Sequence, residues 1–385
     1  MERTIVHTDL DAFFVSCERL RDSRLKNIPI IIGGNTDRGV VASCSYEARY
    51  YGVRSAMPMR LALKLCPQAK VIRGDMELYS KKSTEVTQII AENAPVMEKA
   101  SIDEFYLDVT GLDKLFGCYK WTNELIEKII RETGLPMSFG LSVNKTVSKI
   151  ATGEGKPRGK IEVPPSQTQI FINPLSIKKM PMIGTETYRE LSRIGIRIIQ
   201  NLAETPKEFL YQMFGDNGLT MWKKANGIDL TNVEPYSERK SISTERTFEK
   251  DTTNIKELKA LLIKMVEDLS FDLRQSKQLA SVVTVKIRYS NFDTETKQKK
   301  IPYSANDDVL INTVLPLFDL LYQRRMTIRL VGVRFGGLVQ GNPQIDLFED
   351  TIEQINLLQA IDHLKKRFGA DAVTRAVTMG AYKGK

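Results

Sequence analysis

The chain has 385 residues, of which 42% are hydrophobic, and carries a net charge of +9. This length allows about two to four domains with proper cores, and the excess of basic residues suits a polyanionic partner. Four cysteines without CxxC spacing and only two histidines argue against a structural zinc site or a disulfide scaffold. No signal peptide precedes the first predicted strand, and no apolar run is long enough to span a bilayer. We therefore expect a soluble, cytoplasmic protein.

The elements predicted along the chain change in character twice. Up to about residue 161, short β-prone runs alternate with helical stretches, which is an α/β pattern. Short helices with glycine breaks follow to residue 232, and 233–240 is a polar linker. Residues 241–341 give the order strand–helix–strand–strand–helix–strand, a small α+β domain, and 342–385 is a tail. The main predicted helices span residues 56–65, 78–94, 119–133, 254–275, 307–324 and 352–368.

Two neighbouring acids, Asp103 and Glu104, interrupt the apolar, β-prone run ASIDEFYLDV at residues 100–109. Adjacent strand residues point to opposite faces, so both carboxylates cannot be ordinary solvent-facing positions of one half-buried strand. A hairpin turn without further function is the simplest explanation, and on this stretch alone it stays open. A catalytic explanation requires a further acid from elsewhere in the chain.

The stretch TIVHTDLDAFFVS, near the N-terminus, supplies that acid. It opens as a strand at Ile5, and Asp9 and Asp11 follow where the strand is expected to end. Acids from a strand end and a hairpin turn can converge on one edge of a sheet, where burying them together is costly unless cations neutralise them. Mg²⁺ typically takes one or two carboxylates plus substrate phosphates. The pattern therefore predicts a two-metal centre for phosphoryl or nucleotidyl transfer.

A second motif, MPMIGTETYRELSRIGI, occupies residues 180–196. A tight turn at Ile183 and Gly184, then a helix, then Gly195, is the outline of a helix–hairpin–helix. Such a turn offers backbone N–H groups to a DNA phosphate without reading sequence. A plain pair of helices without a ligand is the alternative. Met182 stands where the first glycine of the turn is expected, which weakens the phosphate cradle.

Together these features resemble the Y-family DNA polymerases, the translesion enzymes, and most nearly their bacterial members. The resemblance runs from residue 5 to about residue 338, and six motifs occur in the order of the family. A single motif would be weak evidence, whereas six at plausible spacing are a strong signal. Phe105 departs from the pattern, because a small residue normally follows the acid pair. The motifs are HTDLDAFFVSCE, GVVASCSYEARYYGVRSAMP, ASIDEFYLDVTG, GLSVNKTVSKIA, GKPRGK and MPMIGTETYRELSRIGI.

The resemblance implies a right-hand polymerase that adds dNTPs to a primer 3′-OH on a DNA template, with low fidelity and without proofreading. It implies a palm with a mixed sheet, small fingers, a helical thumb with the helix–hairpin–helix, and an α+β little finger. We expect the enzyme to act as a monomer. The implied boundaries are 1–10 and 73–165 for the palm, 11–72 for the fingers, 166–232 for the thumb, 233–240 for the linker and 241–341 for the little finger.

The resemblance also assigns the catalytic residues, which are Asp9, Asp103 and Glu104. Asp9 and Asp103 would contact both of two Mg²⁺ ions, and Glu104 would bind the ion at the primer 3′-OH. The backbone carbonyl of Leu10 would complete the nucleotide-side ion. Asp11 matches no ligand of the family, and we expect it to be a helix N-cap.

Residues in three motifs match family positions that contact the incoming nucleotide. Hydroxyl, guanidinium and ammonium groups are the donors that a triphosphate needs. Phe14 matches the steric gate that excludes a ribose 2′-OH, although a core phenylalanine is the alternative without the family context. The implied nucleotide-binding residues are Phe13, Phe14, Ser43, Tyr46, Arg49 and Lys156.

DNA contacts are expected at Ile183 and Gly184 in the thumb, and at Lys286 and Arg288 in the run VVTVKIRYS of the little finger. Strand alternation puts these two basic residues on the same face as Thr284. Further lysines, at positions 297, 299 and 300, are expected on the next connection.

The tail contains NPQIDLFED at residues 342–350, which resembles the peptide with which bacterial polymerases bind the sliding clamp, the β subunit. Leu347 and Phe348 would fill an apolar pocket, and Gln344 would fix the register by amide hydrogen bonds. Composition alone favours a linker. The helix that follows carries Leu357, Ile361, Leu364 and Phe368 on one face, which could pack on the little finger or contact a partner.

Two other classes of function stay open from the residues. A palm-type nucleotide cyclase also joins paired acids to two-metal chemistry, but it needs neither a helix–hairpin–helix nor a basic α+β domain. A non-catalytic polymerase-like protein would keep the DNA-binding domains and lose the acids, all three of which are present here.

Overall fold

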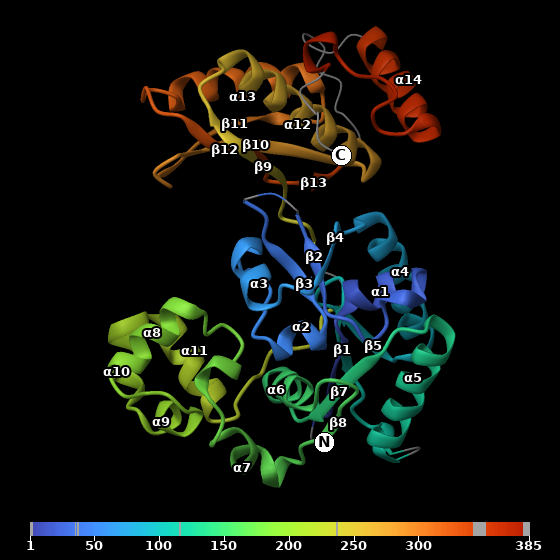
Figure 1. Ribbon diagram of the computed structural model, residues 1–385, viewed down its shortest axis with the longest axis vertical. Coiled ribbons are helices and arrows are strands. Elements are labelled where there is room, and N and C mark those ends of the chain that lie inside the picture. The colour runs from blue at the N-terminus through green and yellow to red at the C-terminus, as the bar shows by residue number, and fades with distance from the viewer. Residues whose placement is uncertain are drawn as a thin grey trace. The chain divides into compact units, whose positions relative to one another are not determined.

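The structure is a computed structural model that describes residues 3–34, 36, 38–114, 117–235, 238–341 and 352–379. It comprises two compact units, Met1–Ser237 and Glu238–Lys385 (Figure 1). The division between them falls inside the predicted linker 233–240. The first unit is α/β and the second is α+β, so the expected multidomain fold class is confirmed.

A five-stranded sheet forms the centre of the first unit, with the strand order β5–β6–β1–β7–β8. β1 pairs antiparallel with β6 on one side and with β7 on the other. The strands span Ile5–Leu10 (β1), Val96–Lys99 (β5), Glu104–Asp108 (β6), Met137–Ser142 (β7) and Lys160–Glu162 (β8).

Helices cover both faces of this sheet (Figure 1). On one face, Val6 and Leu10 share a core with α4 and α5. Alternation along β1 sends His7 and Asp9 to the other face, where α6 lies against the strand. The acids of β1 therefore meet the side chains of α6. The helices span Phe13–Arg21 (α1), Met76–Asn93 (α4), Cys118–Thr133 (α5) and Lys145–Gly155 (α6).

A three-stranded sheet, in the order β3–β2–β4, completes the first third of the chain. α3 begins at Met59 and not at the predicted residue 56, because Ala56 has a left-handed backbone (φ 65°) that a helix cannot include. The elements span Ile30–Gly33 (β2), Val41–Cys44 (β3), Tyr46–Tyr50 (α2), Met59–Leu65 (α3) and Lys70–Ile72 (β4).

Residues 165–225 form short helices around a second apolar core of this unit, which includes Leu191, Leu202 and Leu210 and is shared with buried residues of α6. The helices span Thr168–Ile172 (α7), Thr185–Arg193 (α8), Ile199–Glu204 (α9), Lys207–Phe214 (α10) and Asp216–Ala225 (α11).

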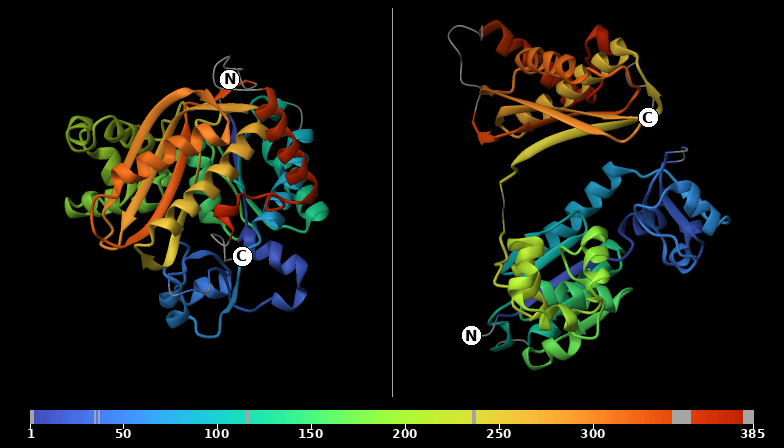
Figure 2. Two further views of the ribbon diagram at one scale, coloured as in Figure 1. Left: turned by 90° about the horizontal axis from the view of Figure 1, so that it is seen from above. Right: turned by 90° about the vertical axis from the view of Figure 1, so that its left-hand side faces the viewer.

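The second unit is a sheet in the order β11–β10–β12–β9 with two helices on one face (Figure 2). Residues 297, 299 and 300 belong to β11, so the expectation that these lysines lie on a connection is wrong. β-Prone residues on both sides extend the strand through them. The elements span Ser241–Thr252 (β9), Ile255–Gln275 (α12), Gln278–Tyr289 (β10), Thr294–Ser304 (β11), Asp307–Leu321 (α13), Ile328–Gly336 (β12) and Val339–Gln340 (β13).

The last helix, α14 (Ile352–Phe368), packs on this unit through charged residues. Asp362 forms a two-pronged ion pair with Arg274 of α12, with both distances 2.8 Å. Lys365 is buried, and its ammonium lies 5.7 Å from the ring centroid of Phe271. Most of the apolar face expected from the sequence is exposed, including Leu357, Leu364 and Phe368. No helix in the described ranges has the length and apolar character needed to cross a bilayer.

Candidate active site

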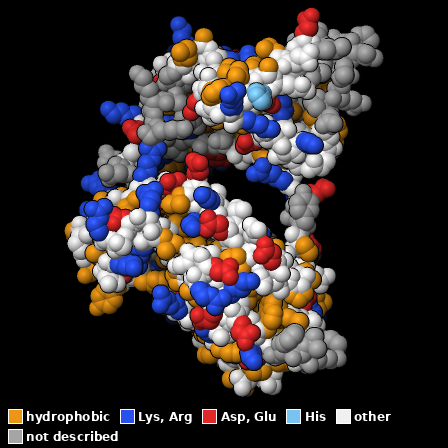
Figure 3. Space-filling model, turned by 90° about the vertical axis from the view of Figure 1, so that its right-hand side faces the viewer, with side chains coloured by type: hydrophobic (Ala, Val, Ile, Leu, Met, Phe, Trp, Pro, Cys, Tyr) orange, Lys and Arg blue, Asp and Glu red, His pale blue; other side chains and the backbone are white. Residues whose placement is uncertain are grey.

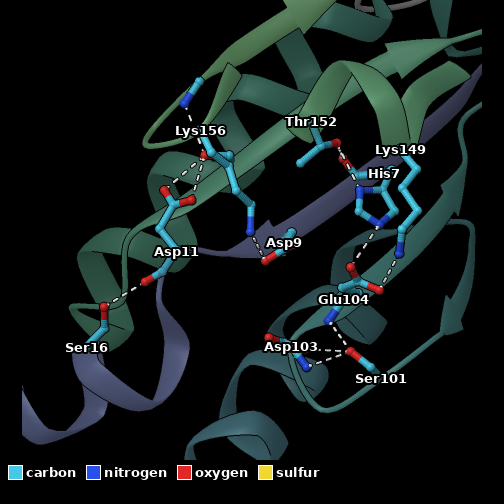
Figure 4. A network of polar contacts seen from close by, with 12 residues as sticks. His7, Asp9, Asp11, Ser16, Ser101, Asp103, Glu104, Lys149, Thr152 and Lys156 are labelled. Atoms are coloured by element: carbon cyan, nitrogen blue, oxygen red, sulfur yellow. Dashed lines mark hydrogen bonds and ion pairs between the residues drawn. The ribbon is translucent and has the colours of Figure 1, made fainter. Parts of the chain in front are cut away.

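Asp9 and Glu104 lie directly opposite each other in the antiparallel pairing of β1 and β6. Residues opposite each other in such a pair share one face of the sheet, and here that face is the one covered by α6. Asp103 precedes β6, and its carbonyl accepts a hydrogen bond of 3.1 Å from the backbone N–H of Leu10. The structure thus brings the three predicted acids to one end of the β1–β6 pair (Figure 4).

The turn that carries Asp103 is fixed by Ser101. The Ser101 hydroxyl donates to Asp103 Oδ1 at 2.6 Å and accepts from the backbone N–H groups of Asp103 (3.2 Å) and Glu104 (3.0 Å). One side chain therefore sets both the backbone of the acid pair and the direction of the first carboxylate.

A lysine within α6 and another directly after it neutralise two of the acids. Lys149 Nζ lies 2.6 Å from Glu104 Oε2, and Lys156, the residue that follows α6, forms an ion pair with Asp9. The sequence had assigned Lys156 to the triphosphate, but no role to Lys149. The sequence could have indicated that Lys149 faces the site, because one helix face is formed at this spacing by Lys145, Lys149, Thr152 and Lys156.

The electrostatics of the site centre on Asp9. Burial raises the pKa of the Asp9 carboxyl to about 7; the Lys156 ammonium opposes this, and the charges of Asp103 and Glu104 add to it. In a buried carboxyl of this kind, near two others, the ionised form is favoured by a nearby cation. Lysines provide that charge in this structure.

His7 is a site residue that the sequence did not single out. Its ring is buried beside β6, with Nδ1 2.9 Å from the hydroxyl of Thr152. Nε2 has no hydrogen-bond partner and lies 4.0 Å from Glu104 Oε1. Burial, followed by the charges of Lys149 and Lys156, lowers the pKa of His7 well below its usual value, so the imidazole is neutral.

Asp11 is not the helix N-cap that the sequence predicted. The residue before α1 is Ala12, which is left-handed (φ 45°), and no side chain caps the helix. The buried Asp11 carboxylate instead accepts hydrogen bonds from the Ser138 hydroxyl (2.9 Å), the backbone N–H of Arg158 (2.7 Å) and the Tyr46 hydroxyl (3.4 Å). The prediction was wrong because the left-handed residue turns the Asp11 side chain away from the helix and toward β7.

The predicted phosphate-binding groups outside the central sheet cluster at β3 and α2. Ser43 lies in β3, and Tyr46 and Arg49 lie one turn apart in α2. The Arg49 guanidinium lies 4.7 Å from the centroid of the Tyr46 ring, which orients both side chains. Burial raises the pKa of Tyr46, so its phenol stays protonated and able to donate.

Phe13 and Phe14 have different environments. Phe13 is only 3% exposed and its ring packs in the core between the sheet and α4, so the ring is not available to a nucleotide. Phe14 is half-buried and stacks on the buried ring of Tyr79, with centroids 4.4 Å apart and planes 11° apart. Phe105 is fully buried in the same core, which accommodates this departure from the family pattern.

Met182, which stands where the first glycine of the predicted helix–hairpin–helix turn is expected, has a left-handed backbone. That residue has φ 73° and is exposed, so a methionine takes a conformation suited to glycine. Ile183 is buried, and Gly184 precedes α8 without a side-chain cap. This leaves the first turn of α8 with its backbone N–H groups at the surface of the motif.

The basic residues predicted on β10 lie on the open face of the second unit, which is the face of its sheet that α12 and α13 do not cover (Figure 2). Residues 284, 286 and 288 alternate with buried positions, as expected. Lys286 is paired with Glu245 of β9 at 2.8 Å, which reduces its net charge, whereas the Arg288 guanidinium donates to the Thr294 hydroxyl. Arg334, which the sequence did not single out, lies opposite Thr284 and is exposed. On the face in Figure 3, Lys and Arg side chains are spread over both units with acids between them.

The predicted clamp contacts Gln344, Leu347 and Phe348 lie outside the described residues.

A metal centre is not assembled by the side chains as they stand. Among the described residues, no group of three or more His, Cys, Asp or Glu is gathered closely enough to hold a metal ion. The three acids nevertheless offer hard oxygen ligands, and two of them are neutralised only by lysines on flexible stems. This donor set fits a divalent cation such as Mg²⁺ once a lysine gives way.

Comparisons with known proteins agree with each other. Residues 8–153 match the impB/mucB/samB family, and 239–347 match its C-terminal domain. The chain is 37% identical to a DNA polymerase IV of Dehalococcoides mccartyi over 96% of each chain, and 34% identical to that of Alkaliphilus oremlandii over 98% of this chain and 99% of the relative. Among solved structures, a Y-family DNA polymerase chimera of Dbh and Dpo4 has a TM-score of 0.77 at 26% identity, covering 87% of this chain and 99% of its own. An insertion ternary complex of Dbh DNA polymerase has a TM-score of 0.64 at 25% identity, covering 89% of this chain and 100% of its own.

Proposed function

The chain belongs to the impB/mucB/samB family and is a translesion, DNA-directed DNA polymerase that binds DNA and uses divalent metal ions. We propose that Asp9, Asp103 and Glu104 are its catalytic residues and that Mg²⁺ is its metal. The observation that carries this proposal is the convergence of the three carboxylates at the β1–β6 pair, together with the cations that neutralise them. Two Mg²⁺ ions held by these acids and by the Leu10 carbonyl would lower the pKa of the primer 3′-OH and neutralise the triphosphate and the departing pyrophosphate.

The chain's own residues prepare this site. Ser101 orients Asp103, and Lys149 orients Glu104, before any ligand arrives. Lys156 exchanges Asp9 for the phosphates of the incoming nucleotide, because both are anions within reach of one flexible ammonium. Asp9 would thereby be free to hold a metal ion.

We propose that Ser43, Tyr46, Arg49 and Lys156 bind the β- and γ-phosphates, with Phe14 as the steric gate below the sugar. The stacking of Phe14 on Tyr79 supports this, since a gate must resist displacement by a 2′-hydroxyl. Phe13 would contribute only its backbone. Ile183, Gly184, Lys286 and Arg288 are proposed contacts to the phosphates of the primer–template.

The palm, fingers, thumb and little finger are proposed with the boundaries given above. Residues 344–348 are the proposed contact with a sliding clamp, which would raise the local concentration of the enzyme at primer ends. The double change Leu347→Ala with Phe348→Ala should leave distributive synthesis unchanged and abolish stimulation by a loaded clamp. We also propose that the enzyme works as a monomer in the bacterial cytoplasm, since all catalytic groups come from one chain and the relatives are bacterial.

Template-dependent extension of a primer by one dNTP with Mg²⁺ tests the proposed function. The chain should add the complementary nucleotide, and Asp9→Asn should be inactive on the same primer–template. Equal extension by both proteins would refute the assignment of the acids.

A further inference from the structure

The buried carboxylate of Asp11 joins two segments that contribute phosphate-binding groups. From α2, the hydroxyl of Tyr46 reaches Asp11 Oδ1 at 3.4 Å. From the turn after α6, the backbone N–H of Arg158 donates to Asp11 Oδ2 at 2.7 Å. Asp11 is only 2% exposed, so it contacts these groups and not the substrate.

The turn after α6 is tightly constrained. Arg158 has a left-handed backbone (φ 52°), and a Cβ on Gly159 would lie 2.0 Å from the carbonyl oxygen of Gly155. Ser138 of β7 donates to Asp11 and accepts from the backbone N–H of Gly159 at 3.1 Å. The turn therefore packs against the end of α6 on one side and is held by Asp11 and Ser138 on the other.

Lys156 lies two residues before Arg158, so the same contacts fix the stem from which its ammonium extends. Tyr46 in turn supports the Arg49 guanidinium through the stacking contact of 4.7 Å. A charged acceptor strengthens each of these hydrogen bonds, and burial from water strengthens them further. One carboxylate thus fixes the relative positions of an ammonium and a guanidinium that come from separate elements.

We infer that Asp11 is a positioning residue for the nucleoside triphosphate: it sets the spacing between Lys156 and the Tyr46–Arg49 pair before the nucleotide binds. This inference rests on the proposed function, which assigns those groups to the β- and γ-phosphates. Loss of the Asp11 carboxylate therefore weakens recognition of the triphosphate and leaves the carboxylates of the metal site in place.

The test is Asp11→Asn in the full chain. The amide has nearly the same shape but no charge, so its oxygen accepts more weakly from Ser138 and Arg158, and the Tyr46 hydroxyl has to turn from donor to acceptor to meet the new NH₂ group. On a dideoxy-terminated primer–template, affinity for the complementary dNTP should fall about tenfold. Affinity for the matching dNDP should fall less, so that the preference for dNTP over dNDP shrinks. In turnover, KM for dNTP should rise more than kcat falls.

Two serines of β7 provide the milder variant and its control. Ser138→Ala removes a donor to Asp11 without touching nucleotide, and should weaken dNTP binding in the same direction by about threefold. Ser142→Ala removes a buried hydroxyl that donates to the Val163 carbonyl at 3.0 Å, and should leave the preference for dNTP over dNDP unchanged. If Asp11→Asn does not fold, dNTP binding by the Ser138→Ala variant tests the inference.

Three outcomes separate the possibilities. An unchanged KM for dNTP in folded Asp11→Asn and Ser138→Ala overturns the inference. An equal loss of dNTP, dNDP and primer–template binding also overturns it, because that result indicates general structural damage. Asp9→Asn is measured in parallel: if it extends primers like the wild type, the proposed function itself has failed, whereas an inactive Asp9→Asn beside a normal Asp11→Asn refutes only the role of Asp11.

Discussion

Glu104 Oε2 lies 2.6 Å from the ammonium of Lys149, on the face of the sheet where Asp9 is paired with Lys156. Asp9 and Glu104, which lie opposite each other in the β1–β6 pair, are thus each neutralised by a lysine, one within α6 and one directly after it. This pairing neutralises carboxylates that converge on one face of the sheet, and it determines how the site should respond to substitution, pH and ions.

Removal of a proposed metal ligand should abolish catalysis and spare DNA binding. Asp103→Ala and Glu104→Ala should each lower single-nucleotide incorporation by about a thousandfold or more, because they remove charge stabilisation at the reacting phosphate. Primer–template affinity, measured by fluorescence anisotropy, should stay within about twofold. Glu98→Ala is the matched control, since Glu98 is an acid of the same sheet that pairs with Lys145. Near wild-type rates in the two variants would show that the acids have another role.

Phe14→Ala should relax the exclusion of ribonucleotides. The side chain acts by clash, so its loss should increase the ratio of ribonucleotide to deoxynucleotide incorporation by roughly tenfold or more, which corresponds to about 1.4 kcal/mol. Competing incorporation of rNTP and dNTP opposite one template base measures this ratio. An unchanged ratio would mean that Phe14 only fills the space beside Tyr79.

Mg²⁺ should compete with a proton at Asp9. With the Asp9 pKa raised to about 7, the carboxyl is mostly protonated at pH 6 and mostly ionised at pH 8, and a ligand must be ionised to bind metal. The concentration of Mg²⁺ that gives half-maximal incorporation should therefore be about tenfold higher at pH 6 than at pH 8. Titrations of Mg²⁺ at both pH values, with dNTP saturating, provide the measurement. Equal midpoints would show that no proton is displaced.

Met182 has a left-handed backbone, so replacing it with glycine should give a more stable protein than replacing it with alanine. Both substitutions remove the exposed side chain, but only glycine removes the steric cost of φ 73°. Met182→Gly should be more stable than Met182→Ala by about 1 kcal/mol. Urea unfolding of the two variants supplies the comparison, and equal midpoints with equal slopes would contradict the strain.

Glu245 should weaken the binding of DNA, because it neutralises Lys286 on the open face of the second unit. Glu245→Gln should therefore raise affinity for primer–template severalfold at low salt, and the gain should disappear as salt is added. Glu249→Gln, at the next exposed acid of the same strand, is the control for net charge alone. Identical gains in both variants would indicate a general charge effect and no role for Lys286.

Much of the fold could be predicted from the pattern of apolar and polar residues along the chain. The order of strands and helices in the second unit was predicted because alternation and helical periodicity are strong there, and α12 and α14 begin and end within a residue of expectation. The face of α14 was not predictable, because counting apolar residues gives no weight to the Arg274–Asp362 ion pair that fixes the helix.

The candidate site was predicted in part for a similar reason. The acids were found because they are unusual in β-prone stretches, and the register of β1 with β6 brings them together. Asp11 was misassigned because its partners, Ser138 and Arg158, lie more than a hundred positions away in the sequence. His7 went unnoticed because its surroundings exist only after α6 packs on β1.

The lysines on Asp9 and Glu104 act as counterions that the chain carries with it. A cluster of acids that depended on dissolved cations would repel itself whenever those cations were scarce, and would strain the sheet that bears it. Here the charge balance is internal, so chelation of divalent metal should silence the enzyme without unfolding it, and readdition should restore activity at once. The lysines thus balance the charge of the acids in the folded chain, whereas divalent metal ions serve the reaction.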